Sequence, residues 1–276
     1  MIQMSNNLFE AALYCIKIEH PFEKASAATS LYKQWCDDEH SAESLSEPER
    51  ILDPGRPVRP RLVDPRRVPK RGFKSRQGLV KLAHAIAHIE FNAINLALDA
   101  AYRFRGMPHD FYTDWLRVAA EESSHFLMLA DYLENNDAQY GDYDAHNGLW
   151  EMALKTDHDV MVRMALVPRV LEARGLDVTP AMISKLDKAG EQQLVDILKV
   201  IHKEEIGHVL TGTRWFNYVC EQRALSPSVI FTELLDKHMN GSIQGPFDED
   251  SRGRAGFTED EMQHLVQMSK RKEAAN

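Results

Sequence analysis

The stretch Glu122-Ser-Ser-His125 decides the fold, because its pattern returns later in the chain as Glu205-Ile-Gly-His208. Each copy follows a lone glutamate at almost the same interval, since Glu90 precedes Glu122 by 32 residues and Glu172 precedes Glu205 by 33. Side chains at i and i+3 leave the same face of a helix, so each Glu-x-x-His pair can reach one metal ion. At about 1.5 Å per residue, the interval lets one helix rise, turn and return to the same height. The pattern predicts two like halves of a four-helix bundle that holds two metal ions.

The acids lie in apolar lines at helical period, which places them in a core and not on a charged face. Ile86 and Ile94 flank Glu90 in this way, and Val118 and Phe126 flank Glu122. Ionised carboxylates are almost never fully buried without partners, so a cation must lie among them. Any one of these residues alone fits an ordinary helix surface, but six in register favour a metal site. The predicted metal ligands are Glu90, Glu122, His125, Glu172, Glu205 and His208.

The ligand types narrow the choice of metal. Arginines could also neutralise the acids, but the two histidines favour metal ions. Four carboxylates and two imidazoles suit Fe or Mn better than Zn, which prefers fewer and softer ligands. We therefore expect two metal ions as cofactors, with iron favoured and manganese the alternative.

Composition is that of a soluble globular protein, with 43% hydrophobic and 27% charged residues in 276. The sequence has no apolar run of 18 residues, and its amino terminus lacks a basic segment followed by an apolar one. We expect a cytoplasmic protein without membrane contact. The cysteines show no Cys-x-x-Cys spacing, which favours reduced thiols over disulfides or a zinc site. They are Cys15, Cys36 and Cys220.

A basic, proline-rich arm precedes the predicted bundle. Residues 6–38 are predicted to be helical with a break at Pro21, and residues 48–69 to be extended. Residues 50–81 hold eleven Arg or Lys against two Asp, a net charge of +9, which leaves −18 for the rest of a chain whose total is −9. The arm could bind nucleic acid or could wrap its own acidic bundle as a strap. Its prolines and apolar residues favour the strap; the apolar residues are Ile51, Leu52, Val58, Leu62, Val63 and Val68.

The predicted fold is all-α, with a ferritin-like four-helix bundle between additional helices at each end. The predicted domains are 1–77 for the N-terminal helices and the arm, 78–222 for the bundle and 223–276 for a C-terminal helical extension. The bundle helices are expected at 78–105, 110–135, 149–174 and 191–222.

Three features of the sequence predict where these helices break, kink or begin. Gly175 and Thr179-Pro180 predict a break after Glu172 and a new short helix at 180–188. Pro168 is expected to kink the preceding helix. The run Thr258-Glu-Asp-Glu261 has the form of a capping box and predicts the start of a C-terminal helix.

Four runs of sequence carry a resemblance to known proteins: His84 to Glu90, Asp114 to Glu122, Leu171 to Asp177, and Gly212 to Phe216. With the motif order, they resemble the ferritin-like di-iron carboxylate superfamily, and in particular a bacterial ferritin-like family of unknown function, number 455. The resemblance implies the bundle and the same six ligands, with Glu122 and Glu205 able to bridge the metals. It implies no known substrate.

Six ligands on two metals leave coordination positions open, which predicts a non-haem di-iron oxidase or hydroxylase that activates dioxygen or peroxide. The sequence does not identify the substrate or the electron donor. It does not determine the oligomeric state either, and a homodimer is one possibility. Two alternatives remain: a metal-storage or detoxification protein, and an RNA-modifying hydroxylase that uses the basic arm. His202, one turn before Glu205, is a candidate for orienting a ligand or transferring a proton. His84 and His88 lie away from the Glu90 face and are expected to be packing or interface groups.

Overall fold

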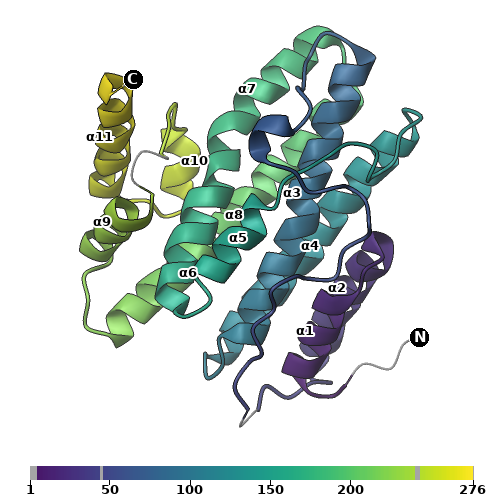
Figure 1. Cartoon of the computed structure of the whole chain (residues 1–276). Helices are drawn as coiled ribbons and strands as arrows, with labels where there is room; N and C mark the ends of the chain where they lie inside the picture. Colours follow the sequence, from purple (N-terminus) through teal and green to yellow (C-terminus); the bar gives the residue numbers. More distant parts are fainter. Residues whose placement is uncertain (1–4, 44–45, 240–242, 276) are drawn as a thin grey trace. The chain divides into compact units, whose positions relative to one another are not determined.

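The computed structural model describes residues 5–43, 46–239 and 243–275, with backbone alone for 271–275. Its regular elements in these ranges are helices (Figure 1), which confirms the all-α prediction. The chain forms two compact units: Met1–Lys155 with Lys188–Ile197, and Thr156–Asp187 with Leu198–Asn276. Because the predicted bundle includes parts of both units, the bundle and the domain boundaries at 77 and 222 stay predictions. Within the described residues, no helix has an apolar stretch that would carry it through a bilayer.

The first unit is built around an antiparallel pair of long helices. In this unit α3 packs against α4, while α1 packs on α3 and α2 on α4. The side chain of Asn7 caps α1 by accepting from two backbone N–H groups, and Ser75 caps α3 by accepting from Gly78 N. The helices of this unit are α1 (Leu8–Lys17), α2 (Pro21–Cys36), α3 (Arg76–Arg103), α4 (His109–Glu134) and α5 (Gly148–Lys155).

The polar side of α3 is buried as well as its apolar side, which the sequence did not indicate. Lys24 of α2 is fully buried there and donates to Asn95 Oδ1 at 2.6 Å and to the Cys15 and Ile16 carbonyls at the end of α1. His88 is also buried, with Nδ1 2.9 Å from the Tyr140 hydroxyl. His84 Nε2 accepts from the backbone of Gly141. The two histidines are therefore packing groups, as predicted.

The arm lies along its own unit and is held mainly through its backbone. Gly55 N donates to Ile16 O at 2.8 Å, and Trp150 Nε1 donates to Leu52 O at 3.0 Å. Ile51 is buried, but Leu52 and Val58 are 63% and 95% exposed. Of the apolar residues that favoured the strap, Leu52 and Val58 therefore do not dock, and the contacts of this part of the arm are made by its backbone.

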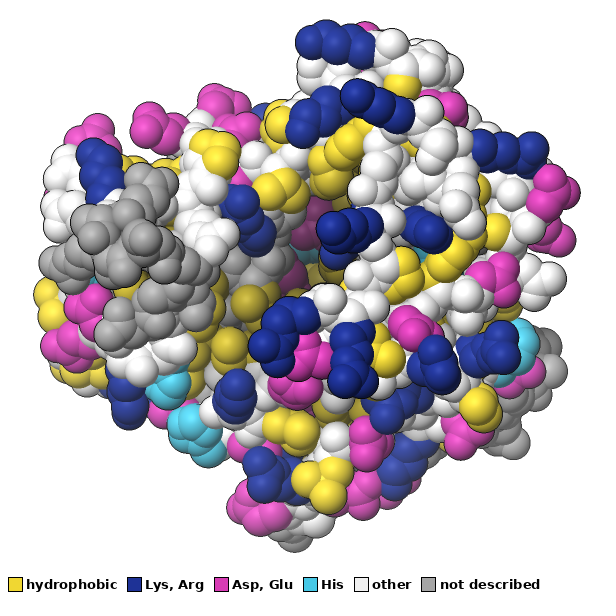
Figure 2. Space-filling view, turned by 45° about the horizontal axis from the view of Figure 1, so that its top comes forward, with side chains coloured by type: hydrophobic (Ala, Val, Ile, Leu, Met, Phe, Trp, Pro, Cys, Tyr) yellow, Lys and Arg dark blue, Asp and Glu magenta, His cyan; other side chains and the backbone are white. Residues whose placement is uncertain are grey.

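Aspartates of the same unit neutralise part of the positive charge of the arm. Arg61 makes two hydrogen bonds to the carboxylate of Asp144, and Arg76 pairs with Asp137 at 2.8 Å. In Figure 2, Lys and Arg side chains are interspersed with Asp and Glu on the face shown. These contacts favour the strap interpretation for the arm.

The second unit contains a π-helical turn where the sequence predicted a kink. The chain runs from α6 (Val160–Leu166) through the π-helix η2 (Val167–Glu172) into α7 (Ala173–Ala189). The predicted break at Gly175 and new helix at 180–188 were wrong, since α7 continues through both with Pro180 inside it. Buried Leu176 and Asp177 anchor this stretch, and such tertiary packing overrides local propensity.

Of the remaining helices, α8 agrees with its predicted range to within one residue and α11 begins directly after Thr258 as predicted, whereas the sequence did not predict α10. The predicted helix 149–174 is divided, because α5 ends at Lys155 before α6 begins. The capping box at α11 is confirmed, with Thr258 N donating to Glu261 Oε2 at 2.9 Å and Glu261 N to Thr258 Oγ1 at 3.3 Å. These helices are α8 (Gln192–Gln222), α9 (Pro227–His238), α10 (Glu249–Arg254) and α11 (Glu259–Ala275).

Candidate metal centre

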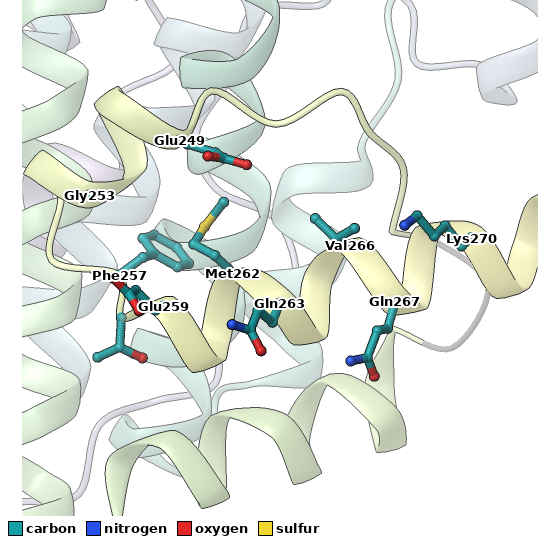
Figure 3. A pocket seen from close by; sticks show the side chains of 10 residues that line it. Glu249, Gly253, Phe257, Glu259, Met262, Gln263, Val266, Gln267 and Lys270 are labelled. Carbon is teal, nitrogen blue, oxygen red and sulfur yellow. The ribbon is translucent and has the colours of Figure 1, made fainter.

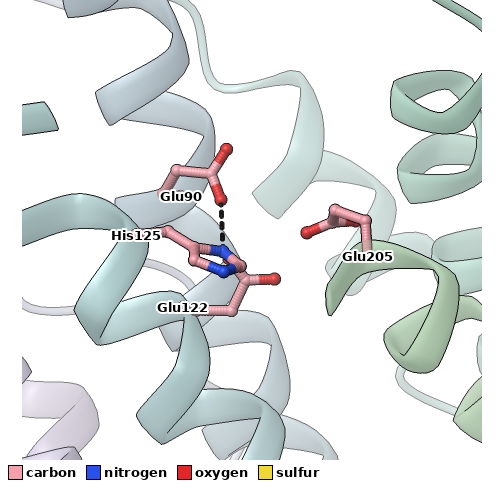
Figure 4. Close-up of side chains that lie close together, drawn as sticks. All are labelled: Glu90, Glu122, His125 and Glu205. Carbon is pink, nitrogen blue, oxygen red and sulfur yellow. Dashed lines mark hydrogen bonds and ion pairs between the residues drawn. The ribbon is translucent and has the colours of Figure 1, made fainter. Parts of the chain in front are cut away.

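Three of the predicted ligands meet in the first unit. Glu90 comes from the middle of α3, and Glu122 and His125 come from one face of α4. His125 Nδ1 lies 3.2 Å from Glu90 Oε2 and 3.4 Å from Glu122 Oε2, and all three side chains are buried. Figure 4 shows Glu90 and His125 pointing toward each other. One ligand atom from each residue lies within 4.8 Å of the others, so this cluster could hold a metal ion.

The two buried carboxyl groups of this cluster are not fully neutralised by its one imidazole, which favours the binding of a cation. Burial, and next the neighbouring charge of Glu122, raise the pKa of Glu90 to about 8, although the hydrogen bond from His125 acts in the opposite direction. A single imidazole therefore does not compensate two buried carboxyls. A bound cation would favour the ionised form of both carboxyl groups and would offset the free energy needed to bury their charges.

The raised pKa of Glu90 predicts a pH dependence in metal-free protein. Between pH 4.5, the ordinary pKa of a glutamate, and about pH 8, the pKa of Glu90 in the folded chain, the folded chain holds a proton that the unfolded chain has lost. The free energy of unfolding should therefore fall as pH rises through this interval. Glu90→Gln cannot titrate and should flatten this fall, which urea denaturation at pH 5 and pH 8 with a chelator present would measure.

The exposed Glu134 at the end of α4 provides a control for that experiment. Glu134→Gln should keep the wild-type slope. Equal slopes for wild type and Glu90→Gln would contradict the proposed burial of an uncompensated carboxyl.

The other predicted ligands lie in the second unit. His208 Nδ1 is 3.2 Å from Glu205 Oε1 on α8, and both residues are buried. Glu172 is half-buried at the end of η2. His202, the candidate for proton transfer, has Nε2 3.4 Å from Ser251 Oγ, and its catalytic role stays a prediction. The sequence thus supplies one Glu-x-x-His pair to each unit.

Comparison with known proteins places the chain in a family. A family model described as "Protein of unknown function (DUF455)" matches residues 17–263. The chain belongs to this family. An uncharacterized protein of Haemophilus influenzae is 47% identical over 219 residues, which cover 77% of this chain and 76% of that protein. No solved structure matches the chain. The resemblance to the DUF455 family is confirmed, and the family description carries no activity.

The donor atoms of this DUF455 chain fit hard or borderline metal ions. The clustered ligands are carboxylate oxygens and imidazole nitrogens, which suit Fe and Mn. The described cysteines are free thiols, as predicted. Cys15 is buried, and burial raises its pKa to about 12, so it is a packing group and not a thiolate ligand.

Sequence reasoning missed two buried ion pairs that flank Glu172 along the chain. Arg169, three residues before it, pairs with Glu261 at 2.8 Å, and Asp177, five residues after it, pairs with Arg252. From the sequence, Glu261 was predicted only to form part of the capping box at the start of a helix. Neither ion pair has a sequence signal, because its partners lie more than 70 residues apart.

Proposed function

We propose that this protein is a dinuclear metal enzyme that activates dioxygen or peroxide to oxidise or hydroxylate a substrate. The observation that supports the proposal is the buried cluster of Glu90, Glu122 and His125, whose ligand atoms lie within 4.8 Å of one another. In this proposal the second unit completes the site with Glu172, Glu205 and His208. The two Glu-x-x-His pairs then serve as equivalent halves of one centre.

The ligand set supports a redox role better than a structural one. Zinc in structural sites is usually held by four ligands, commonly thiolates and imidazoles, whereas a carboxylate-rich set suits Fe or Mn. When bound, such a pair of ions would supply the electrons for reducing dioxygen or peroxide, and iron is the favoured ion.

The protein's own side chains would bind the ions, exclude water and handle protons. Phe91 follows Glu90 on α3, Phe126 follows His125 on α4, and their ring centroids lie 5.7 Å apart in the first unit. Both rings are buried in the packing of α3 against α4, the two helices that carry the cluster. His202 is proposed to relay a proton, with Ser251 orienting its ring.

Metal analysis and oxygen uptake test this function. Protein purified without added metal should contain about two Fe or Mn ions per chain. After anaerobic reduction, the iron-loaded protein should consume oxygen faster than the same iron in buffer. Iron-loaded protein that takes up no oxygen after reduction, and gives no charge-transfer band with oxygen or peroxide, would overturn the proposal.

The same measurements separate the alternatives. Storage or detoxification predicts many ions per chain in a hollow multimer, whereas the enzyme predicts about two ions in a small oligomer such as a homodimer. An RNA substrate would require the arm, so salt-dependent RNA binding should disappear when residues 50–76 are removed. The backbone contacts of residues 52–63 favour the strap and a small-molecule substrate.

A further inference from the structure

Two buried ion pairs flank Glu172 in the sequence, and both connect its segment to the C-terminal helices of the same unit. Arg169 Nη2 lies 2.8 Å from Glu261 Oε2 of α11, with side chains 0% and 3% exposed. Asp177 accepts from Nε and Nη2 of Arg252 on α10, both at 2.8 Å. The segment from η2 into α7 is thus held at both ends by residues of the C-terminal extension.

The first pair is enclosed by aromatic rings. The guanidinium carbon of Arg169 lies 4.0 Å from the ring centroid of Phe231 and 4.7 Å from that of Phe257. Arg169 Nε and Nη1 are buried without a hydrogen-bond partner among the described residues. Glu261 is therefore the carboxylate that compensates this buried charge, and its removal would leave the cation unpaired in an apolar site.

Glu261 performs a second task with the same oxygen atom. Its Oε2 accepts from Thr258 N at 2.9 Å, which caps α11, and from Arg169 Nη2. The first turn of α11 and the π-helix are consequently fixed to one atom. A shift of α11 is transmitted to Arg169, one turn before Glu172.

The second pair acts on the other side of Glu172. Asp177 Oδ1 accepts from Asp248 N at 3.0 Å as well as from Arg252, which joins α7 to the start of α10. Arg252 Nη2 also donates to the carbonyl of Ala173 at 3.4 Å, directly after Glu172. The backbone that leaves the π-helix is therefore attached to α10.

The attachment of α11 is one-sided. Glu261, Leu265 and Met268 are buried along one stripe. A neighbouring stripe, including Met262 and Val266, lines an open groove of about 640 Å³ that α10 also borders (Figure 3). Among the described residues this groove is lined only by residues 249–270, so we expect the position of α11 to depend on the buried stripe that contains Glu261.

We propose that α10 and α11 position Glu172 for metal binding through the Arg252–Asp177 and Arg169–Glu261 pairs. This inference rests on the proposed function, in which Glu172 is a ligand. A π-helical turn is an uncommon conformation that needs support from its surroundings. Metal ligands in general depend on an outer layer of hydrogen-bonded partners, whose loss typically weakens metal affinity 10- to 100-fold.

Anaerobic titration of the full chain with Co(II), followed by absorption, tests the proposal. Glu261→Leu is expected to weaken one of two Co(II) affinities about tenfold or more and to leave the other within about twofold. Glu261→Gln keeps an acceptor of the same shape and should recover much of the lost affinity. Arg252→Lys, which cannot make the two-pronged contact with Asp177, should weaken the same Co(II) step.

Thr258→Ala is the matched control, because it removes the capping hydroxyl and leaves the Arg169 pair in place. It should lower the thermal midpoint without changing either affinity. The proposal is overturned if Glu172→Gln weakens one Co(II) step while the folded Glu261 and Arg252 variants leave both unchanged. If Glu172→Gln itself has no effect, the proposed ligand set fails and this inference fails with it.

Discussion

Replacing Glu122 by Gln together with His125 by Ala is expected to lower bound metal from about two ions per chain to well below one, and to abolish oxygen uptake. These residues supply two of the three donors in the buried cluster of the first unit. In the proposed centre Glu122 would be one of the residues able to hold both ions, so its loss should affect both. Metal analysis after gel filtration, with oxygen uptake on the same samples, measures the effect.

The corresponding pair in the second unit provides the decisive comparison. Glu205→Gln with His208→Ala should cause the same loss if one dinuclear centre uses both Glu-x-x-His motifs. The exposed Glu134 on α4 and Glu221 on α8 give single Gln controls on the same helices, which should keep wild-type metal and activity. Loss of one ion in each double variant, with the other ion retained, would instead show two independent sites.

The sequence predicted the ligand cluster because its signal is periodic and local. Glu90, Glu122 and His125 lie in apolar lines at helical spacing, and such lines require burial whatever the details of the fold. The same reasoning placed the long helices α3, α4 and α8 within about two residues of their observed ends. The assignment of His84 and His88 to packing followed from their position on the other side of α3.

The errors arose where distant contacts determine local structure. Gly175 and Pro180 are helix breakers by propensity, but the buried Asp177–Arg252 pair holds α7 together across them. Lys24 gave no sign of burial, because its acceptors, Asn95 and two carbonyls at the end of α1, come together only after folding. Propensity and periodicity carry no information on such partners.

Gly212→Ala is expected to lower the free energy of unfolding by about 3 kcal/mol, an unusually large effect for one methyl group. A Cβ at this position of α8 would lie closer than 3.0 Å to two ring atoms of Pro168 in the π-helix. A proline ring is stiff, so either η2 or α8 must move. Urea denaturation of metal-free protein would measure the loss without a contribution from metal affinity.

Two further variants separate this clash from a general effect of alanine. Gly207→Ala lies on the same helix with nothing within 4 Å of the new Cβ, so it should be neutral or should stabilise by up to about 1 kcal/mol. Pro168→Gly with Gly212→Ala should recover much of the loss, because the double variant removes both ring atoms, Cβ and Cγ of Pro168, that the new Cβ would meet. Additive losses would contradict the Pro168–Gly212 contact. Recovery would show that this contact sets the distance between η2, which carries Glu172, and α8, which carries Glu205 and His208.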